Sequence, residues 1–298
     1  MRVDDTLFPY RSATGQAALA DLAARQLAAW PVDYASQSLP TRHGETHVLL
    51  AGDEDAPPLI LFHEWNASAA SLYLTYDLEW LALQFRLVMP DTPGQPGRSA
   101  ATPPKATGPA YGEWAADLLD ALDLREVFAV GSAGGGYLAL KLAAHAPDRV
   151  IRALVIGSGG LAAPSGLSPR LLAATLPLRL RPTHANARRF VHAVGAPGKP
   201  LTPAHEHVAG QIALAAEHVQ PFSPPAALTD AELLQIRAPV LLLLGAHDPT
   251  LSAQATAQRA TSTLLNVQVE QVSAGQFVSL DAPGLVETRL FDFFGKIG

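Results

Sequence analysis

The stretch Val127-Phe-Ala-Val-Gly-Ser-Ala-Gly-Gly-Gly136 decides the fold of this chain. An apolar run rich in strand-forming residues ends at Gly131, and a helical pattern of leucines begins directly after Gly136. A strand that enters a sharp turn and continues as a helix is the setting of the G-x-S-x-G nucleophile elbow. Small residues are needed two positions before and after the nucleophile, because the strand and helix backbones nearly touch there. Gly131 and Gly135 meet this need and place the nucleophile position at Ala133.

A second frame, in which Ser132 is the nucleophile, puts Val130 at a position that requires a small residue. The helix after the glycines supports the first frame, because Ala139 and Ala143 fall on one face and Pro147 then ends the helix. A phosphate-binding loop is the other interpretation of the glycines. It is disfavoured because no Lys-Ser/Thr pair follows them and no Gly-x-Gly-x-x-Gly spacing is present.

This pattern resembles the α/β-hydrolase family, whose elbow usually reads Gly-x-Ser-x-Gly-Gly, then x-x-Ala, x-x-x-Ala and x-x-x-Pro. The matching positions are Gly131, Gly135, Gly136, Ala139, Ala143 and Pro147. The resemblance implies an α/β core with a mostly parallel, eight-stranded sheet and helices on both faces. It also implies an ancestral activity of carboxylic-ester or related acyl hydrolysis, of the kind found in capped, carboxylesterase-like serine hydrolases.

The loop after the apolar strand at residues 57–62 begins with His63-Glu64-Trp65. In the family this strand ends in His-Gly, and the next residue supplies one backbone N–H to the oxyanion hole. The resemblance therefore assigns Trp65 and Gly134 as oxyanion-hole or binding residues. Glu64 occupies the glycine position, where glycine allows backbone conformations that glutamate resists. His63 is expected to turn into the core and hydrogen-bond the loop.

Other segments place the remaining elements. The hydrophobic patterns predict helices over residues 14–29, 68–84 and 111–122, and strands over 34–39, 46–51, 86–90 and 150–156. The run from Asp91 to Ser99 resembles the family's Asp-x-x-Gly-x-x-Gly-x-Ser turn. There Asp91 is expected to bind backbone groups and so to shape the fold.

Residues 161–236 differ from the rest, because prolines separate short helical segments and long apolar strands disappear. In the resembled family a helical cap is inserted at this point. We therefore expect an α/β-hydrolase core formed by residues 1–160 and 237–298, with a helical cap over 161–236. The cap carries five histidines, which are expected to be solvated surface residues rather than a metal site: His184, His192, His205, His207 and His218.

The acid and histidine positions follow the cap. The family's seventh strand and its triad acid match the apolar run that leads to Asp248, although an aspartate before the helical pattern at 252–264 could also act as a helix cap. Farther on, the family reads Ala-Gly-His-Phe and then acidic-x-Pro. This chain reads Ala-Gly-Gln276-Phe and then Asp281-Ala-Pro, so Gln276 stands at the position of the catalytic histidine.

Composition limits the remaining possibilities. The 298 residues are 48% hydrophobic and 16% charged, which is enough for a large core. A net charge of −6 and a pI near 5.9 argue against nucleic acid or an anionic membrane as partner. The absence of cysteine excludes disulfides and thiolate chemistry. Neither a signal peptide nor a membrane-spanning run is apparent, so the default expectation is a cytoplasmic protein without a metal or cofactor; the oligomeric state stays open.

Two of the three triad positions therefore lack their chemistry, because alanine has no nucleophile and glutamine cannot accept a proton near neutral pH. Three hypotheses follow: a degenerate hydrolase that binds a small apolar molecule between cap and core, an enzyme that uses Glu64 or a cap histidine for other chemistry, and a hydrolase whose serine was mutated. Ala133 alone would suggest an inactivated variant. With Gln276 and Glu64 beside it, a naturally diverged site is favoured, and binding is preferred because no replacement nucleophile–base pair can be named.

Overall fold

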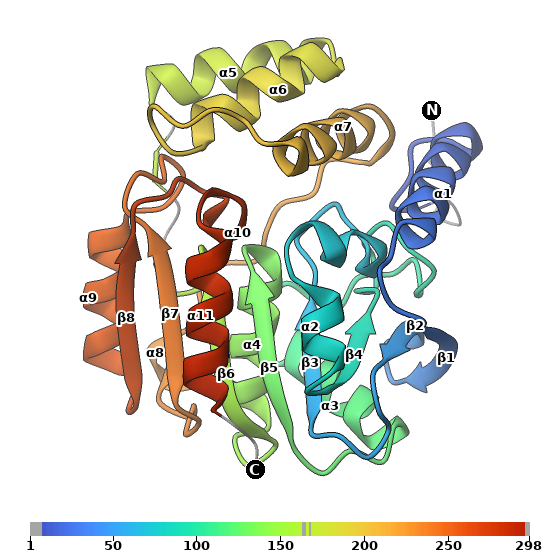
Figure 1. Ribbon diagram of the computed structural model, residues 1–298, viewed down its shortest axis with the longest axis vertical. Helices are drawn as coiled ribbons and strands as arrows, with labels where there is room; N and C mark the ends of the chain where they lie inside the picture. Colours follow the sequence, from blue (N-terminus) through green and yellow to red (C-terminus); the bar gives the residue numbers. More distant parts are fainter. Residues whose placement is uncertain (1–7, 163–164, 167, 296–298) are drawn as a thin grey trace.

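A single eight-stranded sheet organises the computed structural model, which describes residues 8–162, 165–166 and 168–295. The strand order is β1-β2-β4-β3-β5-β6-β7-β8 (Figure 1). The strands are β1 (Ala35–Thr41), β2 (Gly44–Ala51), β3 (Pro58–Phe62), β4 (Arg86–Pro90), β5 (Val127–Ser132), β6 (Val150–Ile156), β7 (Val240–Gly245) and β8 (Val267–Val272). β2 pairs antiparallel with both β1 and β4, and every other neighbouring pair is parallel. The predicted sheet is thereby confirmed.

Helices cover both faces of this sheet. They are α1 (Ala13–Ala28), α2 (Leu78–Ala82), α3 (Ala110–Ala121), α4 (Gly134–His145), α5 (Pro169–Leu180), α6 (His184–Val194), α7 (Pro203–His218), α8 (Asp230–Leu233), α9 (Ala253–Thr263), α10 (Val278–Asp281) and α11 (Pro283–Phe294). Side chains of β3 alternate between two cores, with Ile60 and Phe62 facing α3 and α4, and Leu59 and Leu61 facing α2 and α11. Burial on both faces explains why this strand is apolar throughout.

The helix expected over residues 68–84 is instead two short pieces. A 3₁₀ helix, η2, covers Ala69–Leu74, and α2 begins only after Asp77. Asp77 adopts an extended conformation, and its carboxylate accepts a hydrogen bond from the N–H of Trp80, which caps the start of α2. The continuous helix was wrong because this local cap starts a new helix within the apolar pattern.

Of the four described helices between β6 and β7, three (α5, α6 and α7) lie above the carboxyl ends of the strands (Figure 1). These inserted helices, α5, α6 and α7, share a small hydrophobic cluster of their own that includes Leu178, Val191 and Ala209. Helix α1 packs beside α7, where the Gln26 side chain donates a hydrogen bond to Gln211 at 3.0 Å. No helix in the described part of the chain is long and apolar enough to cross a bilayer.

Candidate active site

The turn between β5 and α4 has the backbone of a nucleophile elbow. Its apex, Ala133, has φ 47° and ψ −112°, a conformation that residues with a side chain rarely adopt. The glycines beside it are sterically required. A Cβ on Gly131 would lie 2.1 Å from the carbonyl carbon of Gly135, and one on Gly135 would lie 2.0 Å from the carbonyl oxygen of Phe62. The strained position is therefore residue 133.

Ser132, the neighbouring hydroxyl, faces another direction. It is the last residue of β5 and is 8% exposed. Its Oγ lies 2.9 Å from the hydroxyl of Tyr76 and 3.2 Å from Oγ of Ser279. Burial raises the pKa of Tyr76 well above its ordinary value, so the phenol stays protonated. Neither partner is a base at neutral pH, and the frame that made Ser132 the nucleophile fails on geometry as well as on sequence.

His63 holds the loop that follows β3. The ring is fully buried, with Nδ1 2.8 Å from the carbonyl oxygen of Glu64 and Nε2 2.9 Å from the backbone N–H of Thr92. Since a carbonyl only accepts and an N–H only donates, Nδ1 carries the proton and Nε2 accepts. Burial lowers the pKa of His63, which keeps the ring neutral. His63 is thus bound on both sides by backbone.

Glu64 fits the loop without taking a glycine conformation. The residue of this loop with positive φ is Asn66, at 60°, two positions farther on. The indole of Trp65 lies so close to Gly134 that a Cβ there would come within 2.7 Å of the ring. Gly134 begins α4, and the first N–H groups of a helix have no partner within it. The loop after β3 and the start of α4 are therefore in contact at Trp65 and Gly134.

Aromatic rings surround this meeting point. The centroid of the Trp65 ring lies 5.8 Å from that of Tyr111, 6.0 Å from that of Tyr137 and 5.0 Å from that of Phe222. Phe222 comes from the segment between α7 and α8, whereas the other three belong to the core. Burial raises the pKa of Tyr111 to about 12. The aromatic cluster formed by these four residues is uncharged at neutral pH and joins the two parts of the chain.

The side chain of Glu64 is partly buried. Burial raises its pKa, which hydrogen bonds from its own backbone and from Thr75 lower only in part. Oγ1 of Thr75 lies 3.4 Å from Oε1 of Glu64, and no cation pairs with this carboxyl among the described residues. A carboxyl in such a setting can hold a proton nearer neutral pH, as general acids do.

The triad acid and histidine positions do not hydrogen-bond each other among the described residues. Oδ1 of Asp248 accepts from the backbone N–H and the hydroxyl of Thr250, at 2.7 and 2.6 Å. Burial raises the pKa of Asp248. The backbone of Gln276 donates to the carbonyl of Val194 at 2.8 Å, while its side-chain Oε1 is buried without a hydrogen-bond partner in the described chain. Ser252, and not Asp248, caps α9.

The carboxyl ends of the strands nevertheless bring Ala133 and Gln276 to the same edge of the sheet. The N–H of Ala133 donates to the carbonyl of Ile156 at 2.9 Å, and a Cβ on the next residue, Gly157, would lie 3.0 Å from the carbonyl oxygen of Gln276. Ala133, Trp65 and Gln276 all remain partly exposed. The inserted helices therefore do not bury these three residues completely.

His205 is not the surface histidine that we expected. It is 2% exposed, because its Nδ1 completes a capping box with Thr202 at the start of α7 and the ring then points into the protein. Nε2 lies 3.3 Å from Oδ1 of Asp281, at ion-pair distance but not aligned for a hydrogen bond. Oδ2 of Asp281 accepts from the N–H groups of Gly275 and Ala196 at 2.7 and 3.1 Å. This His205–Asp281 pair ties α7 to the loop that carries Gln276.

Comparisons with known proteins agree with this geometry. The family model described as "alpha/beta hydrolase fold" matches residues 57–281. "Carboxylesterase YbfK" of Bacillus subtilis (strain 168) is 29% identical over 279 residues, which span 90% of each chain. "Uncharacterized carboxylesterase nap" of the same strain is 27% identical, over 90% of this chain and 89% of its own.

Solved structures show the same likeness. The crystal structure of carboxylesterase CesB (YbfK) from Bacillus subtilis superposes with a TM-score of 0.78 and 26% identity, covering 95% of this chain and 99% of that one. The naproxen esterase from Bacillus subtilis, at 24% identity and a TM-score of 0.77 over 95% and 99% of the two chains, has the same fold. The chain belongs to the α/β-hydrolase fold family and is similar to carboxylesterases.

Proposed function

We propose that this protein is a degenerate hydrolase that binds a small apolar carboxylic ester, or a molecule of similar shape, between the inserted helices and the core, and does not cleave it through the triad positions. The observation that carries this proposal is Ala133 at the apex of an elbow whose backbone is retained. A methyl group occupies the place from which a serine hydroxyl would attack.

The second triad position argues in the same direction. The amide of Gln276 cannot take a proton from a hydroxyl, and Asp248 directs Oδ1 to Thr250 rather than to position 276. Removing the serine or the histidine alone typically costs about 10⁶ in turnover. With both absent, binding and the oxyanion donors are what remains of the ancestral machinery.

The surroundings of the elbow suit an apolar ligand with one polar group. The aromatic cluster of Trp65, Tyr111, Tyr137 and Phe222 offers large apolar faces. The side-chain amide of Gln276 also carries N–H groups, which could donate a hydrogen bond to the carbonyl oxygen of a bound ester. Mostly apolar walls with a few placed polar groups are typical of small-molecule sites.

A second candidate function is catalysis without a triad, favoured by one observation. Glu64 lies on the loop beside the elbow, and burial raises the pKa of its carboxyl group. A protonated carboxyl there could deliver a proton to a bound substrate, which is general acid chemistry that needs no covalent intermediate. In this case the activity should disappear in Glu64→Gln and be unaffected by changes at Gln276.

The test combines calorimetric binding with product analysis, using methyl and phenyl esters of short and aromatic carboxylic acids that are not chemically activated. We expect binding without turnover, and about tenfold weaker binding in Trp65→Ala, since an aromatic contact contributes about 1 kcal/mol beyond burial. Trp80→Ala is the matched control, because Trp80 contacts Phe291 on α11. Failure of every ester to bind would refute the binding proposal. Turnover that is lost in Glu64→Gln would establish the second candidate.

A further inference from the structure

A second serine, histidine and aspartate meet at the antiparallel end of the sheet, far in sequence from the elbow. The β1–β2 hairpin pairs Ser38 with His47 and Ser36 with Leu49. Because side chains alternate along a strand, Ser36, Ser38 and His47 lie on the same face, with Ser36 diagonal to His47. The strand after next in sequence, β4, ends at Pro90 and delivers Asp91 to the same place.

These three side chains form a linear hydrogen-bonded chain. Oγ of Ser36 lies 2.8 Å from Nε2 of His47, and Nδ1 of the same ring lies 2.8 Å from Oδ2 of Asp91. His47 and Asp91 are 5% and 3% exposed, whereas Ser36 is exposed. The order of contacts, hydroxyl to Nε2 and Nδ1 to carboxylate, is the order that activates a serine in a Ser-His-Asp triad.

The carboxylate of Asp91 fixes the protonation of the ring. Burial alone would raise its pKa, but the hydrogen bonds from His47 and from the N–H of Arg98 outweigh burial and hold the pKa below its ordinary value. Oδ1 also accepts from the N–H of Ala69 at 2.8 Å. An ionised Asp91 can only accept, so Nδ1 of His47 carries a proton, and in the neutral form of the ring Nε2 is free to accept from the hydroxyl of Ser36.

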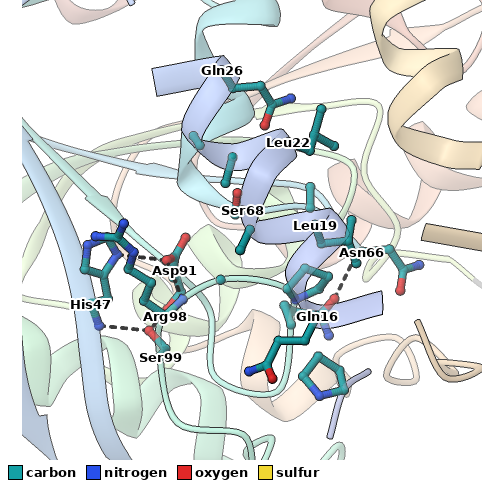
Figure 2. Close-up of a pocket in the computed structure, with 18 of the residues that line it drawn as sticks. Gln16, Leu19, Leu22, Gln26, His47, Asn66, Ser68, Asp91, Arg98 and Ser99 are labelled. Atoms are coloured by element: carbon teal, nitrogen blue, oxygen red, sulfur yellow. Dashed lines mark hydrogen bonds and ion pairs between the residues drawn. The ribbon is translucent and has the colours of Figure 1, made fainter. Parts of the chain in front are cut away.

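A cavity of about 350 Å³ is lined by His47 and Asp91, whereas Ser36 is not among its lining residues and lies on the exposed side of the relay. In Figure 2, His47 and Asp91 lie at one end and the side chains of Leu19 and Leu22 project from α1 at the other. Leu49, which pairs directly with Ser36, is also part of the wall. The volume is within the range of small-molecule sites, and the leucines would accommodate a short acyl chain.

We propose that Ser36, His47 and Asp91 form a second acyl-transfer site, which is acylated by small activated carboxylic esters such as aryl acetates. Ser36 Oγ forms a bond to the ester carbonyl carbon while its proton passes to Nε2 of His47. The bond from that carbon to the leaving aryloxide then breaks, and the proton on Nε2 neutralises the leaving group. The products are an acylated Ser36 and a phenol. Water then attacks the acyl carbon while Nε2 of His47 takes its proton, the bond from that carbon to Oγ of Ser36 breaks, and the proton returns to Oγ as the carboxylic acid leaves.

This site is independent of the proposed ligand site at the elbow. It contains none of the residues at the elbow or on the loops after β7 and β8, and its cavity is lined neither by Ala133 nor by Gln276. The failure of either proposal leaves the other unaffected, because one concerns non-covalent binding of unactivated esters and the other a covalent bond at a named serine.

The experiment treats the whole protein with a fluorophosphonate probe and, separately, with p-nitrophenyl acetate, and maps the modified peptide by mass spectrometry. We expect one adduct, on Ser36, which is absent in Ser36→Ala. Ser38→Ala is the matched control, because Ser38 is exposed on the same strand and the same face. Its labelling rate should equal that of the unmodified chain, as should that of Ser132→Ala.

His47→Gln should slow the labelling of Ser36 by about 10²- to 10⁴-fold, the usual contribution of a general base. Circular dichroism verifies that this variant is folded. If His47→Gln is not folded, the position of the adduct in the unmodified chain, in Ser36→Ala and in Ser38→Ala decides the question. An adduct at neither serine, equal labelling of Ser36 and Ser38, or an unchanged rate in folded His47→Gln would overturn the proposal.

Discussion

The elbow and the two loops after β7 and β8 belong to the same candidate site, yet they differ in how they are held. Close backbone packing holds the elbow, since Gly131 and Gly135 leave no room for a side chain and Ala133 is fixed in a strained conformation. One side chain supports it, because Oγ of Ser158 donates to the carbonyl oxygen of Ala133 at 2.6 Å. The loops are also joined by backbone hydrogen bonds, but their functional side chains have no common partner among the described residues. Asp248 binds Thr250 within its own loop, while Gln276 has a buried oxygen without a partner in the described chain.

The difference shows which part of such a site persists when its chemistry changes. Backbone packing tolerates a change from hydroxyl to methyl at position 133, because the turn does not depend on the side chain it presents. The hydrogen bond between a triad acid and its histidine does not survive the loss of the histidine. With Gln276 in place of the histidine, the carboxylate of Asp248 accepts hydrogen bonds from Thr250 instead. The elbow thus needs one side chain to recover its nucleophile, whereas the loops need both a base and a reoriented acid.

The largest expected effect comes from breaking the elbow itself. Gly135→Ala would place a Cβ 2.0 Å from the carbonyl oxygen of Phe62, a contact that neither backbone can relieve. We expect destabilisation at or above the roughly 3 kcal/mol that severe overpacking costs, measured by urea unfolding. Gly284→Ala is the control, because a Cβ there meets nothing within 4 Å. A Gly135→Ala protein as stable as this control would show that the elbow is not sterically held.

The second-largest effect is expected from Asp281, whose hydrogen bonds and ion pair hold the loop that carries Gln276. Asp281→Asn removes the charged acceptor of the Gly275 N–H and the partner of His205, and should cost on the order of 3 kcal/mol at neutral pH. Burial alone would raise the pKa of Asp281, but His205 and the backbone donors lower it. Its contribution is therefore complete above the ordinary carboxyl pKa and is lost as pH falls through the lower folded value.

Unfolding curves from pH 7 down to pH 3 measure this contribution. The difference in unfolding free energy between the unmodified chain and Asp281→Asn should shrink below about pH 4. The exposed Asp292, whose contact in the described chain is to Arg289 at 3.8 Å, provides the control Asp292→Asn. A difference that stays constant with pH would mean that Asp281 acts through packing rather than charge.

A smaller change should stabilise the protein. Ala133→Gly removes the side chain from a residue at φ 47° and ψ −112°, where strain costs about 1–3 kcal/mol, and adds about 0.5–1 kcal/mol of backbone entropy cost. We expect a net gain of about 1 kcal/mol in thermal unfolding. Ala17→Gly, on the exposed side of α1, should instead lose about 1 kcal/mol. Equal losses in both variants would contradict a strained elbow.

The smallest effect concerns the loop after β3. Because burial raises the pKa of Glu64, its contribution to stability is complete below the ordinary carboxyl pKa and is lost as pH rises through the folded value. Glu64→Gln should therefore be more stable than the unmodified chain at pH 8, by less than about 1 kcal/mol, and lose that advantage near pH 4. The exposed Glu54 gives the control Glu54→Gln, which should show no such dependence.

The sequence predicts the backbone better than the side-chain contacts of this protein. The glycine spacing at residues 131 and 135 is a steric requirement, so it identifies the elbow and the residue at its apex from sequence alone. The strands from β3 to β7 are mostly apolar, apart from Arg86 in β4 and Arg152 in β6, because helices cover both faces of the sheet there; such runs are visible without a structure. The order of the family's motifs along the chain then predicts the mostly parallel, eight-stranded sheet.

The sequence contains no pattern that predicts which side chains pair across the fold. His205 and Asp281 are 76 positions apart, and their pairing depends on how α7 lies over the loop after β8. The relay of Ser36, His47 and Asp91 depends on the register of the β1–β2 hairpin, which the sequence placed only approximately. The break before α2 depends on the capping aspartate at 77, which an apolar pattern does not reveal.

The rate of ester hydrolysis in a double-mutant cycle at positions 133 and 276 tests the central claim most directly. The cycle compares Ala133→Ser, Gln276→His and their combination, all in a Ser36→Ala background so that a second serine does not contribute. Each single change should leave the rate near background, because a serine without a base is not activated and a base without a serine has nothing to deprotonate.

The double change should then exceed the sum of the single changes by at least about 10²-fold. Adding Glu64→Gly controls for the oxyanion loop, whose loss can itself cost on the order of 10²–10³ in rate. Hydrolysis by the parent chain that disappears on Gln276→Ala would contradict the account. So would folded double and triple variants that both stay at background, because either the elbow would then not present residue 133 for attack or Asp248 would not turn from Thr250 to the new histidine.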